Sequence, residues 1–174
     1  MLKIPSFKLA AIAFIAAIAM TISGAPGAFA MKKMVVGPVA FDVPDDFKEA
    51  AGGAPAIQQD ASSTTIEVAE LPTMALQEFK GQTFLDFLGT LKYTNAAYAD
   101  GALKREGTYT YVLADAKGAR GPESRFLLVI GGEGRAAIVT AYAPKSEIDS
   151  GRASRAAIEA ILSSATVVPG AAKQ

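Results

Sequence analysis

The sequence predicts an α+β fold in which a central antiparallel β-sheet is flanked by helices, as an α/β/α sandwich. Two apolar runs, Phe126–Ile130 and Ala136–Tyr142, flank the glycine-rich stretch Gly131–Gly134, which is a strong signal for a β-hairpin. Apolar residues occupy both alternating faces of these runs, so we expect both faces of the sheet to be covered. Helical patterns elsewhere in the chain supply elements that could cover them.

The first 30 of the 174 residues have the pattern of a secretory signal peptide. Lys3 and Lys8 lead into the apolar run Leu9–Ile22, and Ala28–Ala30 provides an A-x-A cleavage site. The alternative is an uncleaved anchor, but the run is short for a membrane span, which needs roughly 20 apolar residues. We therefore expect cleavage after Ala30. Residues 31–174 would form a single periplasmic or secreted domain with no stable membrane span.

In the first half of this domain, alternating and β-branched residues predict short strands, and Met31–Lys33 is expected to be loose. The predicted strands are Met34–Val43, Ala56–Gln59 and Thr64–Leu71. Ile66 and Val68 are expected to face inward from the third strand. Pro44–Phe47 is predicted to open a turn or a short helix, because proline and acidic residues are favourable in a first helical turn.

In the second half, one amphipathic helix is predicted over Gln82–Lys92. Its apolar stripe consists of Phe84, Leu85, Leu88 and Leu91, with Phe87 at the edge. The remaining expected elements are a helical extension over Asn95–Tyr98, a strand over Leu103–Ala114, a turn at Asp115–Gly118, a helix within Lys145–Ser164 and a short strand over Ala165–Val168. Gly151 is expected to divide the last helix, and Ser146 with Asp149 resembles a capping box.

Composition excludes several kinds of chemistry. The chain has no cysteine and no histidine, which removes thiol catalysis, thiolate metal sites and the commonest general base. Removal of Lys3 and Lys8 from 17 basic residues leaves a net charge of about −2 against 17 acidic ones. A chain so close to neutrality lacks the basic patch typical of nucleic-acid binding, so no nucleic-acid partner is expected.

No residue pattern predicts a catalytic, cofactor or metal site. Gly131–Gly134 lacks the spacing and lysine of a phosphate loop. Glu67 and Glu70 would lie on opposite faces of a strand, which argues against shared acid–base chemistry. Asp45 and Asp46 could join a calcium site, but calcium needs six to eight oxygen ligands, and a helix start is the simpler interpretation.

Two short patches are candidates for partner binding. Tyr109 and Tyr111 share one face of a strand, and tyrosine is enriched at binding surfaces. The alternative is that both rings lie under a helix on a covered sheet face. The second candidate is the loop after Pro44, with Asp45 and Asp46.

Two motifs resemble the PsbP-like superfamily. Phe41–Phe47, FDVPDDF, resembles its opening pattern F-x-x-P-x-x-[FW], and Ile161–Val167, ILSSATV, resembles its closing pattern i-x-x-S-F-x-v. Ala165 stands where phenylalanine is common, and Phe47 stands where tryptophan is common.

The resemblance implies an antiparallel sheet between helices, used as a binding or accessory module. The superfamily includes extrinsic proteins of photosystem II, a nuclear protein that binds the GTPase Ran, and exported bacterial proteins. It has no catalytic motif to carry over.

We therefore expect a non-enzymatic, exported binding or accessory domain of the cell envelope, without cofactors, whose partner is an envelope protein or a small ligand. Two alternatives remain open at this point. One is a carboxylate-dependent hydrolase, which two acids with shifted pKa values in one cleft would favour. The other is a self-assembling surface or structural protein, which a large exposed apolar patch would favour.

Overall fold

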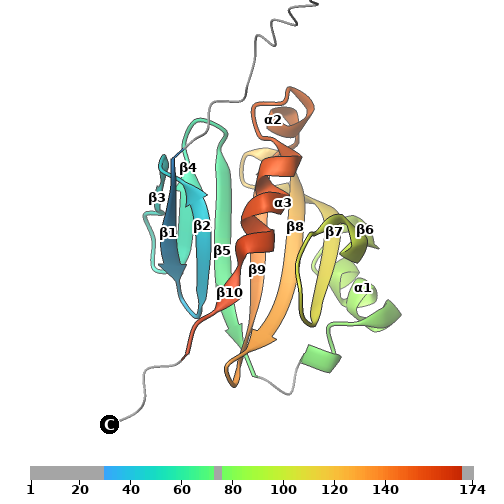
Figure 1. The fold of residues 1–174 in the computed structure, drawn as a ribbon. Coiled ribbons are helices and arrows are strands. Elements are labelled where there is room, and N and C mark those ends of the chain that lie inside the picture. Colours follow the sequence, from blue (N-terminus) through green and yellow to red (C-terminus); the bar gives the residue numbers. More distant parts are fainter. Residues whose placement is uncertain (1–29, 73–75, 170–174) are drawn as a thin grey trace, which may run out of the picture.

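Three long antiparallel strands, β7 (Tyr109–Gly118), β8 (Gly121–Gly132) and β9 (Arg135–Pro144), form the centre of the computed structural model, which describes residues 30–72 and 76–169 (Figure 1). The predicted hairpin is confirmed, because Ile130 pairs with Ala137 in an antiparallel register. Its turn is tighter than expected and consists of Glu133 and Gly134, both with positive φ. Positive φ at both residues is typical of a type I′ turn, whose backbone twist matches the twist of the two strands that it joins. The predicted signal peptide, apart from Ala30, lies outside the described residues.

These strands belong to a seven-stranded antiparallel sheet. Across it, the order is β3 (Phe47–Glu49), β4 (Ala56–Gln59), β5 (Thr64–Leu71), β9, β8, β7 and β6 (Thr94–Tyr98). The predictions for β4 and β5 are confirmed, and Ile66 and Val68 are buried as expected.

The edge strands of this sheet settle two predictions. At Pro44 the turn alternative is correct and the helix start is wrong, because Asp45 and Asp46 form a turn and Phe47 then pairs with Gln59 of β4. The helical extension over Asn95–Tyr98 is also wrong. These residues form β6, which pairs with β7 through a register shift between Thr94 and Ala97. Tertiary pairing outweighs weak local propensity in both cases.

A separate three-stranded sheet contains β1 (Met31–Val36), β2 (Val39–Pro44) and β10 (Thr166–Val167), with β2 in the middle. The single strand predicted over Met34–Val43 is therefore a hairpin. Gly37 has a φ of 55° in its loop, where Pro38 needs no ladder hydrogen bond. Met31–Lys33 is paired rather than loose, because it lies opposite the end of β2.

The β7–β8 hairpin extends beyond the predicted turn. Asp115–Gly118 continues β7, and Gly118 pairs with Gly121 across Ala119 and Arg120. The strand begins at Tyr109 rather than Leu103, because the short 3₁₀ helix η2 (Asp100–Ala102) and the loop after it precede the strand.

The helices are α1 (Gly81–Thr90), α2 (Lys145–Asp149) and α3 (Arg155–Ser164). Gly151, with a φ of 75°, lies between α2 and α3 and divides the last helical region as predicted. The capping box at Ser146 is wrong, because Pro144 is the N-cap of α2 and makes no side-chain cap. Ser154 caps α3 instead, where its side chain accepts a hydrogen bond from the Ala157 N–H at 3.3 Å.

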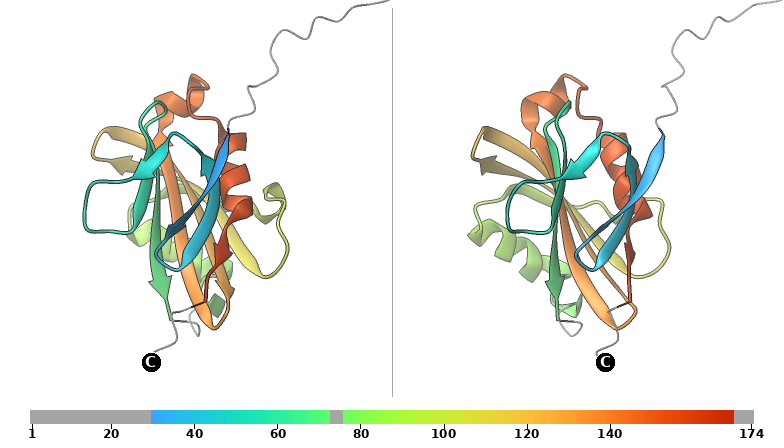
Figure 2. Two further views of the ribbon diagram at one scale, coloured as in Figure 1. Left: turned by 60° about the vertical axis from the view of Figure 1, so that its left-hand side comes forward. Right: turned by 90° about the vertical axis from the view of Figure 1, so that its left-hand side faces the viewer.

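Two hydrophobic cores lie on opposite faces of the large sheet. Figure 2 shows α3 and the three-stranded sheet on one side of the large sheet and α1 on the other. Phe41, Leu128 and Leu162 are fully buried on the α3 side. On the other face, Phe84 and Leu88 of α1 pack on the large sheet, whereas Leu91 is half-exposed. The α+β class and the covered sheet are confirmed, and the second sheet beside α3 was not predicted.

No helix within residues 30–72 and 76–169 is both long and apolar enough to cross a membrane.

Candidate functional site

The first predicted binding patch is covered. Tyr111 has no exposed surface, and its hydroxyl donates to Glu159 Oε1 of α3 at 3.2 Å. Burial raises the pKa of Tyr111, and Glu159 adds to that rise. Tyr109 is half-buried and donates to the carbonyl of Asp100 in η2. A partner cannot reach Tyr111 while α3 is in place, so the covered-face alternative is correct for this residue.

The second predicted patch is accessible. Asp45 and Asp46 are exposed in the turn between β2 and β3. Lys32 Nζ donates to the Asp45 carbonyl at 2.7 Å, and Gln59 Nε2 donates to Asp46 Oδ2 at 2.8 Å. In the described part of the chain, no three acidic residues gather closely enough to hold a metal ion. Partner binding at Asp45 and Asp46 stays a prediction.

A different group of residues has the most developed polar geometry, and we call it the Arg125 cluster. It consists of Glu67, Tyr93, Glu123, Arg125 and Tyr142. Arg125 on β8 pairs directly with Tyr142 on β9, and it lies on the same face of β8 as Leu127 and Val129. Those two residues contact α1, so the cluster lies beyond the part of the face that α1 covers, toward the start of β8.

Arg125 is held in one orientation by three neighbours. Its guanidinium carbon lies 4.3 Å from the ring centroid of Tyr142 and 5.6 Å from that of Tyr93. Nη2 donates to Glu123 Oε2 at 2.7 Å, and both side chains of this ion pair are largely buried. Arg125 Nε is also buried and has no hydrogen-bond partner within the described residues. The cluster thus contains an oriented cation whose hydrogen-bonding capacity is only partly used.

The ion pair depends on a glycine in the neighbouring strand. A Cβ atom added at Gly118 would overlap the carboxylate of Glu123. Glu123 pairs with Ala116 of β7, and its side chain extends from there over Gly118. Gly118 does not need positive φ, so its role at this position is to leave room for the carboxylate.

Tyr142 extends the cluster toward β5. Its hydroxyl donates to Glu67 Oε1 at 2.6 Å. Burial raises the pKa of Tyr142 to about 12, and the hydrogen bond to Glu67 contributes to this rise. Tyr142 is therefore protonated at neutral pH and poorly suited to act as a base or nucleophile.

The carboxylates do not form a catalytic pair. Glu70 lies on the opposite face of β5 from Glu67, as the strand period predicts, and forms an ion pair with Arg135 at 2.7 Å. Glu67 and Glu70 therefore cannot act together on one bound group.

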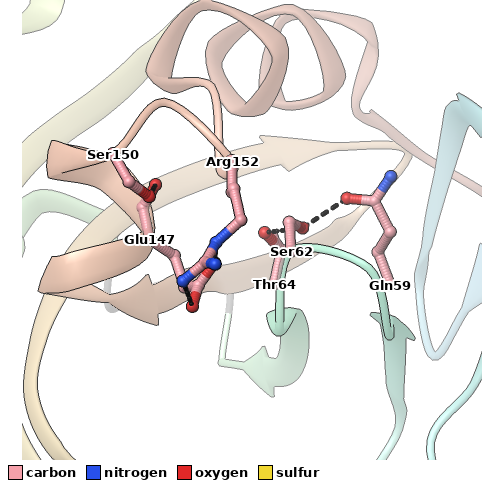
Figure 3. A network of polar contacts seen from close by, with 6 residues as sticks. All are labelled: Gln59, Ser62, Thr64, Glu147, Ser150 and Arg152. Atoms are coloured by element: carbon pink, nitrogen blue, oxygen red, sulfur yellow. Dashed lines mark hydrogen bonds and ion pairs between the residues drawn. The ribbon is translucent and has the colours of Figure 1, made fainter.

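Two further sets of hydrogen-bonded side chains lie at the α2 end of the molecule (Figure 3). Ser62 is buried in the turn between β4 and β5 and bonds to Gln59 and to Thr64. Arg152 follows α2 and donates from Nε and Nη2 to both carboxylate oxygens of Glu147, at 2.6 and 2.7 Å. This bidentate pair closes the loop between α2 and α3.

Sequence reasoning missed the Arg125 cluster, although part of it was within reach. The predicted hairpin brings the strands of Arg125 and Tyr142 together, but a turn over Gly131–Gly134 would place Arg125 opposite Thr140; the tighter turn at Glu133 and Gly134 is what pairs it with Tyr142. No sequence signal indicates that Tyr93 lies near them, because this contact depends on how the chain runs from α1 into β6.

Comparisons with known proteins identify the fold. No family model and no curated protein matches the sequence. The structure is similar to the Ran-binding protein Mog1p of Saccharomyces cerevisiae, with a TM-score of 0.51 and 13% identity over 81% of this chain and 97% of that one. It is also similar to the cyanobacterial PsbP, CyanoP, of Synechocystis sp. PCC 6803, with a TM-score of 0.52 and 13% identity over 83% and 96% of the two chains.

The chain is therefore an α+β protein built on an antiparallel sheet. Its fold is the PsbP-like fold, which the two sequence motifs had suggested.

Proposed function

We propose that this chain is an exported, non-enzymatic accessory domain of the cell envelope that binds a protein partner through the Arg125 cluster. The observation that carries the proposal is an arginine held between two tyrosine rings, beyond the part of the sheet that α1 covers. Arginine and tyrosine dominate the energetics of protein interfaces. An arginine already oriented by Glu123 loses less conformational freedom on binding.

The fold and the chain's first residues support the same proposal. Mog1p is a Ran-binding protein, so this fold can serve to bind another protein. Export follows from the signal-peptide pattern of residues 1–30, which would leave residues 31–174 as a single domain, an α/β/α sandwich, in the periplasm or outside the cell.

A binding role agrees better than catalysis with the chemistry of the cluster. The sequence has no histidine or cysteine to move a proton or attack a carbonyl at neutral pH. Tyr142 keeps its proton because its pKa is about 12. The charged groups present are suited to hydrogen bonding and stacking with a partner.

The proposal can be tested by photo-crosslinking in cells. Thr140 is half-buried on β9 and pairs with Glu67 and Leu127, so a crosslinking amino acid there should capture the partner. The same amino acid at Lys48, exposed on edge strand β3, is the control. We expect a discrete adduct from position 140 only, and we expect Arg125→Gln to remove it.

A second variant distinguishes a loss of binding from a loss of folding. Tyr142→Phe keeps the ring under Arg125 but removes the hydrogen bond to Glu67, so it should retain the adduct and the thermal stability better than Arg125→Gln. The proposal fails if position 48 captures the same protein. It also fails if a folded Arg125→Gln variant keeps the adduct, or if the purified protein shows turnover that a single folded substitution abolishes.

A further inference from the structure

A pocket lies on the opposite face of the sheet from the Arg125 cluster, between α2, the start of α3 and strands β6 to β8. Its apolar lining comes from Leu113, Phe126 and Ile148, and its polar lining includes Asn95, Asp115, Ser124 and Arg155. Ala114 and Arg125 also border the pocket, but they alternate with the residues of β7 and β8 named above, so their side chains face the other side of the sheet. The function proposed above uses the Arg125 side chain on that other side.

The size of the pocket limits what it can hold. Its volume is about 170 Å³, whereas a water molecule in the liquid occupies about 30 Å³ and sites for drug-sized ligands run from about 300 to 1,000 Å³. The pocket therefore has room for a few carbon atoms and one polar group. A lining that combines apolar side chains with a few polar ones selects a small amphiphilic molecule.

Asp115, the acidic residue of the lining, already has hydrogen-bond donors that compensate its charge. Asp115 Oδ2 accepts hydrogen bonds from Asn95 Nδ2 at 2.9 Å and from Lys145 Nζ at 3.1 Å. These two bonds hold the pKa of Asp115 below its usual range, so its carboxylate is ionised and paired. Asn95 reaches it from the irregular part of β6, where its own φ is positive.

Within the described residues, Arg155, the basic residue of the lining, has N–H donors that remain free to bind a ligand. Arg155 donates from Nε to Glu159 at 3.0 Å, and this bond leaves its two terminal nitrogens available. Its side chain is 52% exposed, so those nitrogens remain hydrated until a ligand arrives. Arg155 is also the first residue of α3, a ten-residue helix whose amino-terminal dipole favours an anion. Ser124 offers a hydroxyl on the β8 side.

We propose that this pocket binds a small carboxylate with a short apolar tail, in which Arg155 takes the carboxylate and Leu113, Phe126 and Ile148 take the tail. A free amine with the same tail would meet Arg155 and an Asp115 carboxylate that is already paired with Asn95 and Lys145, so it should be excluded by charge. For so small a ligand we expect a dissociation constant on the order of 1 mM.

The experiment is a titration of the ¹⁵N-labelled protein, purified from the cell envelope and observed by NMR. Isovalerate is the probe, and isoamylamine, which has a similar branched tail, is the charge control. We expect saturable shifts from the amides of Ser124, Ile148 and Arg155 with isovalerate and none with the amine. Arg155→Gln should weaken isovalerate binding at least tenfold.

Arg152 supplies a matched control. It is an exposed arginine three residues from Arg155, and it pairs with Glu147 outside the pocket lining. Arg152→Gln should leave the affinity unchanged. The inference is overturned if no saturable shift appears at tens of millimolar isovalerate, if the amine binds equally well, or if Arg152→Gln weakens binding as much as Arg155→Gln does.

Discussion

Substitution of Gly118 by alanine should destabilise the protein, because the added methyl group would displace Glu123 of the neighbouring strand β8. Gly118 has an ordinary strand conformation, and replacement of such a glycine by alanine stabilises a protein by about 0.5 to 1 kcal/mol in the absence of a clash. At this position the new Cβ overlaps the carboxylate of Glu123. Glu123 must then move, and its ion pair with Arg125 breaks.

The size of the effect follows from the burial of that ion pair. Loss of one partner of a fully buried pair costs about 3 to 5 kcal/mol. The side chains of Arg125 and Glu123 are 17% and 7% exposed, and Glu123 is flexible enough to reach water after displacement. We therefore expect a loss of about 1 to 3 kcal/mol for the ion pair, which the backbone gain reduces to a net loss of roughly 1 kcal/mol. For a domain of this size, the melting temperature should fall by roughly 2 to 4 °C.

A double-mutant cycle distinguishes this mechanism from a general packing defect. Without the Glu123 carboxylate, Gly118→Ala meets no obstacle, so in the Glu123→Ala background it should be neutral or stabilising in urea denaturation. Gly89→Ala, inside α1 where an added Cβ meets nothing within 4 Å, is the control and should stabilise by about 0.5 to 1 kcal/mol. An equal loss from Gly118→Ala in both backgrounds would refute the reasoning.

Three further outcomes are expected. Val139→Asp should destabilise by several kcal/mol, about 3 or more, because an unpaired charge would enter a fully buried position; a urea midpoint close to that of the unchanged protein would place Val139 at the surface. Tyr142 should titrate near pH 12 by tyrosinate absorbance. Because the folded pKa lies above the unfolded value of 10.0, its contribution to stability is complete below pH 10 and is lost as the pH rises toward 12, and Tyr142→Phe should remove this part of the alkaline stability loss. The mass of the protein recovered from the envelope should correspond to a chain that begins at Met31; recovery of the full-length chain would contradict cleavage after Ala30.

The hairpin at Glu133–Gly134 was predictable because apolar alternation and turn chemistry are local signals. The same signals fixed the two faces of β8, where Phe126 and Leu127 lie in different cores. Apolar alternation did not predict the edge strand β6, because this strand carries few apolar residues. Residues 94–98 of β6 show this, since they are mostly exposed and gain their structure from pairing with β7.

The candidate site was harder to predict than the fold because it depends on cross-strand neighbours. Tyr111 looked like a binding residue, since nothing in its strand shows that α3 covers it. Arg125 immediately precedes the apolar run Phe126–Ile130, and no local signal shows that two tyrosines and Glu123 surround it. Pairing with Tyr142 depends on the two-residue turn that the structure shows, and the contact with Tyr93 depends on the tertiary structure.

The three-stranded sheet joins the two ends of the described chain. Its middle strand, β2, is bordered by β1 at the start and by β10 close to the end, with Val167 opposite Val39. A growing chain can assemble the hairpins of the large sheet early, because the paired strands are close in sequence. The pairing of β2 with β10, in contrast, cannot form until residues more than 120 positions further along the chain have been synthesised. For the exported protein that we propose, this order delays completion of the three-stranded sheet until β10 has been made. Until then β2 lacks one of its two neighbours, which keeps the chain incompletely folded and easier to thread through a translocation channel.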